Sequence, residues 1–375
     1  MSQRTMKMPR GICAILLVVG VGLAACAAPP QTTAPTQLPA AVASNTSQPT
    51  EVAAATGTSG PTNTPEAYKP VIRKAEKPWR IGFGDGYGGI PFTNAVWKNV
   101  QDVAAQMGVD ASYCDNASDQ TKTIACLNSF VVKKMDGVIF ANWIGGSEPA
   151  MAAILHKANI PCVTWSGAHP GCVDFGVDGY TANVQGGNWL GAYAAKQGWD
   201  PNQTAWVVIW NPDIPFHKQE ADGAKAGMAQ SGFNVPASNI FDVPQKTASD
   251  PYPNMLAWLT GHPNFKNVLC FGIAGDSTGV ACNQALKDRG YLGRAAVGST
   301  GATEEALVEF RTHSDAESTF KVSIAYFPEH WGEYMVPIIV DLIEGKSVPS
   351  KVTIPTTPIT RDNIDQYYPQ ATPTP

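Results

Sequence analysis

The sequence lacks a basic excess and a metal-binding cysteine or histidine motif, and each absence excludes a class of protein. Charged side chains make up 15% of its 375 residues, with 26 basic against 31 acidic ones. A mildly acidic chain without a basic stripe is not expected to bind nucleic acid. No CxxC pair and no Cys/His group with ligand spacing occurs, so we expect no metal and no cofactor.

Residues 27–67 lack aromatic side chains, and Glu51 and Glu66 are their only charges. Ala, Pro, Thr, Ser, Gln and Gly dominate this stretch, which has no apolar periodicity. Such a segment cannot bury enough apolar surface to offset its ordering entropy. With Cys26 it forms a predicted disordered tether at residues 26–68, whose reach is roughly 35 Å for a flexible chain of this length.

The first 25 residues have the pattern of a secretory signal peptide. Three basic residues precede an apolar run at positions 12–23, which ends in the small residues Ala24 and Ala25. The run is shorter than the roughly 20 residues that a transmembrane helix needs. An uncleaved N-terminal anchor is the alternative interpretation.

The segment Leu23-Ala24-Ala25-Cys26 resembles the lipobox of bacterial lipoproteins. That resemblance implies that Cys26 is acylated and becomes the first mature residue, and two or more acyl chains hold a protein durably at a bilayer. We therefore expect an exported protein that is anchored by Cys26 to the outer face of the cell membrane and does not span it.

Six cysteines follow Cys26, and an even number in an exported protein favours disulfides. They fall into three local pairs, from which we predict the bonds Cys114–Cys126, Cys162–Cys172 and Cys270–Cys282. Two of these would join a strand to the helix that follows it. Locality is a preference among 15 possible pairings, and a zinc site is the competing interpretation.

The folded part, of roughly 300 residues, is long enough for two lobes. Short apolar strands alternate with amphipathic helices twice, first over residues 79–177 and again over 183–343. This alternation predicts an α/β fold with two doubly wound parallel-sheet lobes. We place the N-terminal lobe at residues 69–180 plus 327–347, and the C-terminal lobe at 181–326 plus 348–370. Ligands of such sheets bind at the carboxyl ends of the strands.

Two segments match enzyme motifs. Residues 84–89 satisfy GxGxxG directly after the first strand, which a dinucleotide fold would use to bind a pyrophosphate. Ile90 and Pro91 separate them from the helix, so we interpret the segment as a ligand-facing loop. Residues 275–279 satisfy GxSxG, the pattern of a nucleophile elbow. A serine hydrolase built on Ser277 is one hypothesis, and a helix N-cap at Ser277 is the one we favour.

Several segments together resemble the type I periplasmic solute-binding proteins of ABC importers, nearest the ribose-type sugar-binding branch. They are residues 90–92 (IPF), 136–142 (DGVIFAN), 158–164 (ANIPCVT), 177–180 (VDGY), 262–263 (HP), 275–276 (GD) and 297–298 (VG). The resemblance covers residues 79–343. It implies two lobes joined by a three-segment hinge that close on a small ligand, and an ABC permease in the membrane as partner. We expect the protein to act as a monomer.

The resemblance also implies ligand contacts, but several positions depart from the family pattern. Phe92 matches a stacking aromatic, Asn142 an asparagine at a strand end, and Asp178 lies at a crossover. Against this, Ser166 and Thr300 replace sugar-binding aspartates, Gly275 an asparagine and Tyr326 a glutamine, while Lys218 or Glu220 stands where an arginine is expected. Most of the polar clamp for a free pentose is missing, and aromatic residues take its place.

The candidate ligand-binding residues lie after or at the ends of the expected strands. They are Tyr87, Phe92, Asn142, Trp143, Trp165, Ser166, Asp178, Asn211, Phe216, Glu220, Asp276, Thr300 and Tyr326. We predict a lipid-anchored receptor for a sugar or sugar-like compound that delivers its ligand to an importer. A receptor for a nucleoside, purine or small signalling molecule and a sensor subunit for a membrane kinase are the alternatives.

Overall fold

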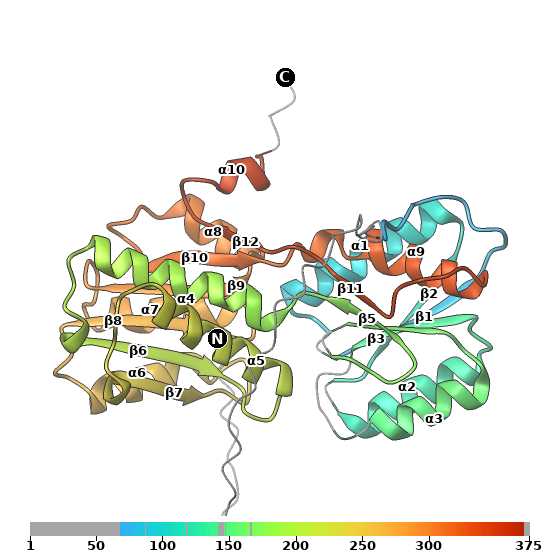
Figure 1. Ribbon diagram of the computed structural model, residues 1–375, viewed down its shortest axis with the longest axis horizontal. Helices are drawn as coiled ribbons and strands as arrows, with labels where there is room; N and C mark the ends of the chain where they lie inside the picture. The colour runs from blue at the N-terminus through green and yellow to red at the C-terminus, as the bar shows by residue number, and fades with distance from the viewer. Residues whose placement is uncertain are drawn as a thin grey trace, which may run out of the picture. The chain divides into compact units, whose positions relative to one another are not determined.

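The computed structural model describes residues 68–370 except 87, 118, 142–145, 147 and 166. Two six-stranded sheets, each flanked by helices, form the N-terminal and C-terminal lobes (Figure 1). The predicted signal peptide, the predicted acylation site Cys26 and residues 27–67 of the predicted tether lie outside the described residues. Within the described ranges, no helix has both the length and the apolar character needed to cross a membrane.

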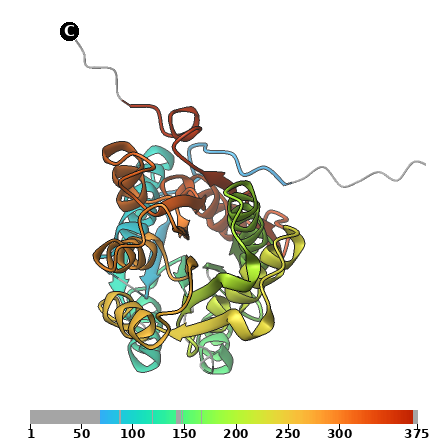
Figure 2. The same ribbon diagram turned by 90° about the vertical axis from the view of Figure 1, so that its left-hand side faces the viewer.

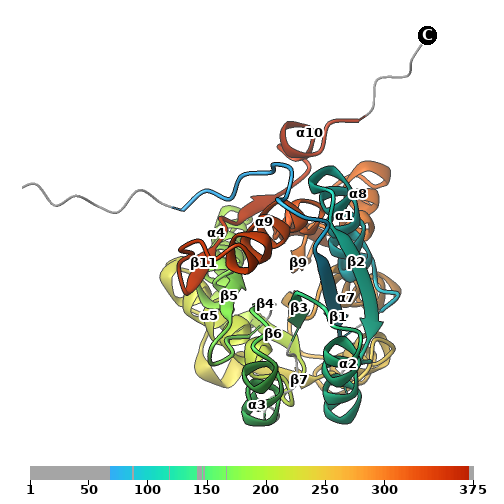
Figure 3. The same ribbon diagram turned by 90° about the vertical axis from the view of Figure 1, so that its right-hand side faces the viewer.

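The N-terminal lobe has the strand order β11-β5-β4-β3-β1-β2, with every neighbouring pair parallel. Its elements are β1 (Arg80–Asp85), α1 (Pro91–Met107), β2 (Asp110–Asp115), α2 (Gln120–Val132), β3 (Gly137–Ala141), α3 (Glu148–Ala158), β4 (Cys162–Trp165), β5 (Val173–Gly176), α9 (Gly332–Ile343) and β11 (Lys351–Thr353). Figure 3 shows α1 and α9 on one face of the sheet and α2 and α3 on the other. All five residues of β3 are buried, as expected for a central strand covered on both faces.

The C-terminal lobe repeats this order as β12-β10-β9-β8-β6-β7. Its elements are α4 (Gly179–Lys196), β6 (Thr204–Trp210), α5 (Pro215–Gln230), β7 (Ile240–Pro244), α6 (Pro251–Gly261), β8 (Asn267–Gly272), α7 (Asp276–Asp288), β9 (Ala295–Gly301), α8 (Glu304–Thr312), β10 (Phe320–Ala325), β12 (Thr357–Ile359) and the short α10 (Ile364–Tyr367). The connecting 3-10 turns are Pro201–Gln203, Ala237–Asn239 and Pro328–His330. Viewed from this end, helices lie on both sides of the strands (Figure 2). Only β12 is antiparallel to its neighbour.

Three segments connect the lobes. They run from β5 to α4, from β10 to α9, and from β11 to β12. The expected boundaries need one correction, because β11 pairs with β5 of the N-terminal lobe although residues 348–370 were assigned to the C-terminal lobe. The second segment contains Phe327, a non-glycine residue with a φ of 53°. The three connections are the structural basis for a hinge between the lobes.

Helices α4 and α5 pack backbone against backbone. A Cβ atom on Gly187 would lie 1.9 Å from the carbonyl oxygen of Ala224, and one on Gly227 would lie 2.1 Å from that of Val184. Only glycine permits such an approach. The sequence pattern predicts helices that begin at residues 183 and 219, and both begin four residues earlier, at Gly179 and Pro215.

The three predicted disulfides are present: Cys114–Cys126, Cys162–Cys172 and Cys270–Cys282. The first joins β2 to α2 and the third joins β8 to α7, so two of them link a strand to the following helix, as predicted. The second connects β4 to the segment before β5. Within the described residues no group of three potential metal ligands occurs.

Candidate functional site

A cleft of about 500 Å³ lies between the lobes, where the carboxyl ends of the strands of both sheets meet the hinge segments. Its volume falls within the range of small-molecule sites. The N-terminal lobe, including its strand β11, contributes Ile90, Phe92, Glu148, Gly167, Ala168, Asp174, Phe175, Val177, Asp178 and Lys351. The second lobe and its hinge segment contribute Gly179, Asn211, Pro215, Phe216, His217, Gln219, Glu220, Gln245, Lys246, Thr247, Ala248, Ala274, Gly275, Ser277, Thr300, Gly301, Tyr326 and Trp331.

Aromatic rings form the wall on the N-terminal lobe, and Trp331 is their centre. Its ring lies edge-on to Phe92 at 5.2 Å, to Phe175 at 5.4 Å and to Trp165 at 5.7 Å between ring centroids. Its Nε1 donates a hydrogen bond to the carbonyl oxygen of Tyr326 at 2.7 Å. Edge-to-face contacts of this kind stabilise packing beyond simple burial. Trp331 therefore fixes the wall to the second hinge segment.

The first two turns of α5 form the opposite wall. Pro215 occupies the first turn, where its fixed φ favours helix initiation and its missing N–H costs nothing. Phe216 is half-buried, whereas His217 is buried and burial lowers the pKa of its imidazole to about 3. His217 is therefore neutral at physiological pH, and its Nδ1 has no hydrogen-bond partner within the described structure.

Glu220 lies one turn further along α5 and is the deepest acidic group of the cleft. Its side chain is only 2% exposed, and its Oε1 accepts a hydrogen bond from the Tyr326 hydroxyl at 2.7 Å. Asn183 of α4 donates to the same hydroxyl at 2.9 Å. Burial raises the pKa of Glu220 to about 8, although the bonds with Tyr326 and Asn183 oppose that shift. The carboxyl is thus mostly protonated at neutral pH while it has no cationic partner.

Asp276 lies at the start of α7, just behind the cleft surface. Its carboxylate accepts hydrogen bonds from the hydroxyls of Ser299, Ser323 and Thr303 and from the backbone N–H of Thr303. It is fully buried, and burial raises its pKa despite these donors. Since its acceptor positions are filled by the protein, Asp276 joins α7 to β9 and β10 rather than facing the cleft.

The cleft brings together seven of the predicted ligand-binding residues. They are Phe92, Asp178, Asn211, Phe216, Glu220, Thr300 and Tyr326. Asp178 also caps α4 by accepting a hydrogen bond from the Thr181 N–H at 2.8 Å. Tyr87, Asn142, Trp143 and Ser166 lie outside the described residues.

Two predicted positions need correction. Trp165 is fully buried beneath the wall, where it stacks on Phe83 at 5.7 Å and does not reach the cleft surface. Asp276 is likewise absent from the lining, although its neighbours Gly275 and Ser277 belong to it. The sequence pattern selects strand ends that border the cleft, but not which residue of each end lines it.

The serine hydrolase hypothesis for Ser277 receives no support from the geometry. Ser277 is the second residue of α7, and the helix is capped by Gly275, so the N-cap expected at Ser277 is also wrong. A serine hydrolase would need a histidine base, for which the later part of the chain offers His313 and His330. Both have other partners: His313 Nδ1 lies 3.2 Å from Glu309, and His330 Nδ1 lies 2.8 Å from Glu333. No hydrogen bond between either histidine and Ser277 is found among the described residues. The other motif, GxGxxG, leads into α1, and Ile90 at its end lines the cleft.

Sequence reasoning missed two important members of the site. Trp331 lies in a hinge segment far along the chain from Phe92, so no local pattern places the two rings together. Asn183 was assigned to the first residue of a helix, whereas it lies within α4 and faces Tyr326. For Trp331, the available signal in the sequence was its position directly before the last long helix.

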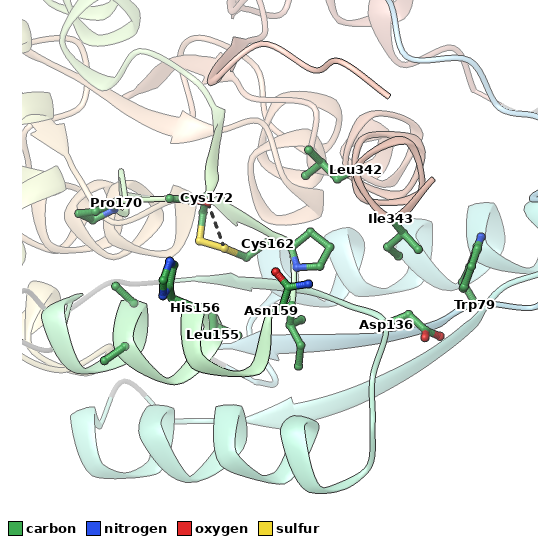
Figure 4. Close-up of a pocket in the computed structure, with 15 residues that line it drawn as sticks. Trp79, Asp136, Leu155, His156, Asn159, Cys162, Pro170, Cys172, Leu342 and Ile343 are labelled. Atoms are coloured by element: carbon green, nitrogen blue, oxygen red, sulfur yellow. Dashed lines mark hydrogen bonds between the residues drawn. A yellow bond between two sulfur atoms is a disulfide. The ribbon is translucent and has the colours of Figure 1, made fainter. Parts of the chain in front are cut away.

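A second cavity of about 840 Å³ lies within the N-terminal lobe (Figure 4). Leu155 and His156 of α3, the Cys162–Cys172 disulfide, and Leu342 at the end of α9 contribute to its walls. It borders Asp136 and Pro161, which precede β3 and β4, so it lies at the amino ends of the strands. Ligands of open α/β sheets bind at the opposite ends. The smaller cleft, which both lobes line, is therefore the candidate ligand site.

Comparisons with known proteins agree with this geometry. Residues 81–347 match the family described as periplasmic binding protein domain. An L-arabinose-binding periplasmic protein of an ABC transporter from Azospirillum brasilense is 24% identical over 281 residues, which are 63% of this chain and 82% of that protein. Among solved structures, an ABC transporter solute-binding protein from Actinobacillus succinogenes with bound D-allose has a TM-score of 0.64 at 14% identity, covering 77% of this chain and 100% of that one. One from Bacillus halodurans with bound myo-inositol also has a TM-score of 0.64, at 15% identity, covering 77% and 97%.

The solved structures share the fold, and the family match extends over both lobes and across the cleft. The type I architecture expected from the sequence, with two parallel-sheet lobes and three connections, is thereby confirmed. The chain belongs to the family of periplasmic binding proteins.

Proposed function

We propose that this protein is the solute-binding component of an ABC importer and that it captures a sugar or sugar-like compound between its lobes. The observation that carries the proposal is the cleft itself, which both sheets line near the carboxyl ends of their strands and which two of the three hinge segments border. A ligand that contacts both walls stabilises the closed form, because only that form provides both sets of contacts.

The two walls supply the contacts that a sugar ring uses. Phe92 from α1 and Phe216 from α5 offer aromatic faces to its C–H surface, while Asn211 and Thr300 offer hydrogen-bonding groups. One relative is named as an L-arabinose-binding protein, and two similar solved structures contain bound D-allose and myo-inositol. These sugars and this polyol support the proposed ligand class. Tyr87, Asn142, Trp143 and Ser166 remain proposed contacts from the sequence.

A thermal-shift screen of the purified protein tests ligand capture. The panel comprises D-allose, D-galactose, L-arabinose, D-ribose, myo-inositol and, for the alternative ligand class, adenosine and guanosine. A compound at 100 times its dissociation constant adds about 2.7 kcal/mol to the stability of the folded state. We expect at least one sugar or polyol to raise the melting temperature.

Two variants locate the site. Phe216→Ala removes an aromatic face from the cleft and should weaken binding, whereas His156→Ala alters only the second cavity and should leave binding unchanged. Loss of binding in His156→Ala alone would move the site to the second cavity. A shift by nucleosides alone would replace the sugar assignment.

We further propose that the protein is exported and held at the outer face of the cell membrane by acylated Cys26, with residues 27–67 as its tether. Replacing Cys26 with serine should release the protein from the membrane fraction. Uptake of the radiolabelled ligand by cells lacking the chromosomal copy tests the importer partner. Wild-type protein should restore uptake and Phe216→Ala should not; a kinase response without uptake would favour the sensor alternative.

A further inference from the structure

Glu220 is a cleft carboxyl for which the protein supplies no cation. It lies in the wall formed by α5, is 2% exposed, and has the Tyr326 hydroxyl as its closest hydrogen-bonding partner, at 2.7 Å. No ion pair involves Glu220 anywhere in the described part of the chain. Buried carboxylates in proteins are normally paired with a cation or fully hydrogen-bonded.

The two lysines that line the cleft are committed to other carboxylates. Lys246 Nζ lies 2.9 Å from Asp213, and Lys351 Nζ lies 3.9 Å from Asp174. Both pairs lie at the rim, where Lys246 and Lys351 side chains are 65% and 59% exposed. His217, on the same face of α5, is buried and uncharged. The titratable groups near Glu220 are thus a neutral imidazole and the Tyr326 hydroxyl.

The surroundings of Glu220 also suit a cationic group. Phe216 and Glu220 both pack against Gly179. A Cβ atom added to Gly179 would lie 2.9 Å from Phe216 Cε2 and 3.0 Å from Glu220 Cγ, so the aromatic ring and the side chain of Glu220 are neighbours. Aromatic faces attract desolvated cations. The buried Nδ1 of His217 and Oδ1 of Asn183 have no partner within the described structure. An ammonium group has three donors and no acceptor, so it matches an acceptor-rich site.

We propose that the cleft takes a sugar that carries a protonated amino group, with Glu220 as the counter-ion that recognises it. This inference rests on the proposed function and names its ligand class. Because Glu220 is mostly protonated without a cation, binding of an ammonium group displaces its proton into solution and leaves a buried carboxylate–ammonium pair. The hydroxyl of Tyr326 remains hydrogen-bonded to the carboxylate throughout.

Calorimetric titration with matched probes tests the proposal. D-Glucosamine and D-galactosamine are compared with D-glucose, D-galactose and N-acetyl-D-glucosamine, which lack the charge. We expect an amino sugar to bind at least about tenfold more tightly than its neutral parent and its N-acetyl form. Titration in buffers of different ionisation enthalpy at pH 7 should detect the release of up to one proton on binding.

Glu220→Gln keeps an acceptor for Tyr326 but cannot ionise when an ammonium group binds, so it should fold and should lose about tenfold to a hundredfold in amino-sugar affinity. Glu304→Gln, the same substitution at an exposed position on α8 of the same lobe, should alter affinity less than twofold. Circular dichroism of both variants establishes that they are folded.

Three outcomes would overturn the inference. Neutral sugars that bind as tightly as their amino counterparts exclude a charge-recognising site. Equal amino-sugar affinity of Glu220→Gln and wild type excludes Glu220 as counter-ion. Binding of neutral sugars alone leaves the proposed function intact and removes only its ligand class. If no sugar of either kind binds, the proposed function itself fails.

Discussion

The two lobes have sheets of matching strand order but present different chemistry to the cleft. The N-terminal wall consists of aromatic rings packed around Trp331, and its acidic groups Glu148, Asp174 and Asp178 are at least partly exposed. The C-terminal wall contains the buried polar groups His217 and Glu220, with the Asp276 network behind them. The same topology therefore supports a wall held by ring packing and a wall held by hydrogen bonds. The stability of the aromatic wall should therefore depend on side-chain volume, and that of the polar wall on ionisable groups and on pH.

The largest effect is expected from removing the centre of the aromatic wall. Trp331→Ala deletes contacts with Phe92, Trp165 and Phe175 and should cost about 3–5 kcal/mol of unfolding free energy. Denaturant titration measures the loss. Trp331→Phe, the control, retains a ring but not the bond to Tyr326, so its cost should be smaller. A loss below about 1 kcal/mol for Trp331→Ala would contradict the central role of this ring.

The disulfides allow the lobes to be compared under reduction. Cys114–Cys126 and Cys270–Cys282 both close loops with a sequence separation of 12, so loop entropy gives each about 3 kcal/mol. They differ in access, since Cys270 and Cys282 are fully buried whereas Cys114 is half-buried. A mild reductant should open the N-terminal pair first. Alkylation followed by mass spectrometry reads the order, and earlier opening of Cys270–Cys282 would refute it.

The polar wall should gain stability when its buried ionisable carboxyl is replaced by an amide. In the folded protein the pKa of Glu220 lies near 8 rather than at its ordinary value of 4.5, so the folded state retains a proton that the unfolded state loses. Stability therefore falls as pH rises from about 4.5 to 8. Glu220→Gln should be more stable than wild type by about 3 kcal/mol at most at pH 7, and equal to it at pH 4. Urea titrations at both pH values measure this, and a difference independent of pH would contradict it.

His217 should have the opposite pH dependence and the smallest of these effects. Its pKa is lowered from 6.5 to about 3, so the unfolded state takes up a proton that the folded state does not. Stability is complete above about pH 6.5 and is lost as pH falls toward 3. His217→Gln should remove about 2 kcal/mol of that loss at pH 5. Parallel stability curves for wild type and variant between pH 7 and 5 would show that His217 does not titrate in this way.

The sequence predicted the fold where burial is uniform. The apolar run at residues 137–141 coincides with β3, because a central strand covered on both faces leaves a continuous apolar segment. The three disulfide pairs were likewise predicted correctly, since each links elements that are adjacent both in sequence and in space. The family expected from seven short segments was confirmed by the match over residues 81–347.

The site was predicted less completely, for two physical reasons. The first turn of α5 carries Pro215 and little apolar periodicity, so the helix was expected to begin only at residue 219. The relation between Trp331 and Phe92 depends on the hinge segment that follows β10, which no local pattern encodes. Asp276 shows that a shift of one residue at a strand–helix junction exchanges a ligand-facing side chain for a structural one.

The glycine contact between α4 and α5 limits how this receptor can change its specificity during evolution. Gly187 and Gly227 leave no room for a side chain, so substitutions there are opposed by backbone atoms of the neighbouring helix. Phe216 and Gln219, at the cleft end of α5, have no such restriction. Selection for a new solute can therefore act on those two positions without separating the helix pair. The same division suits an engineered biosensor, in which recognition is altered while the supporting scaffold remains unchanged.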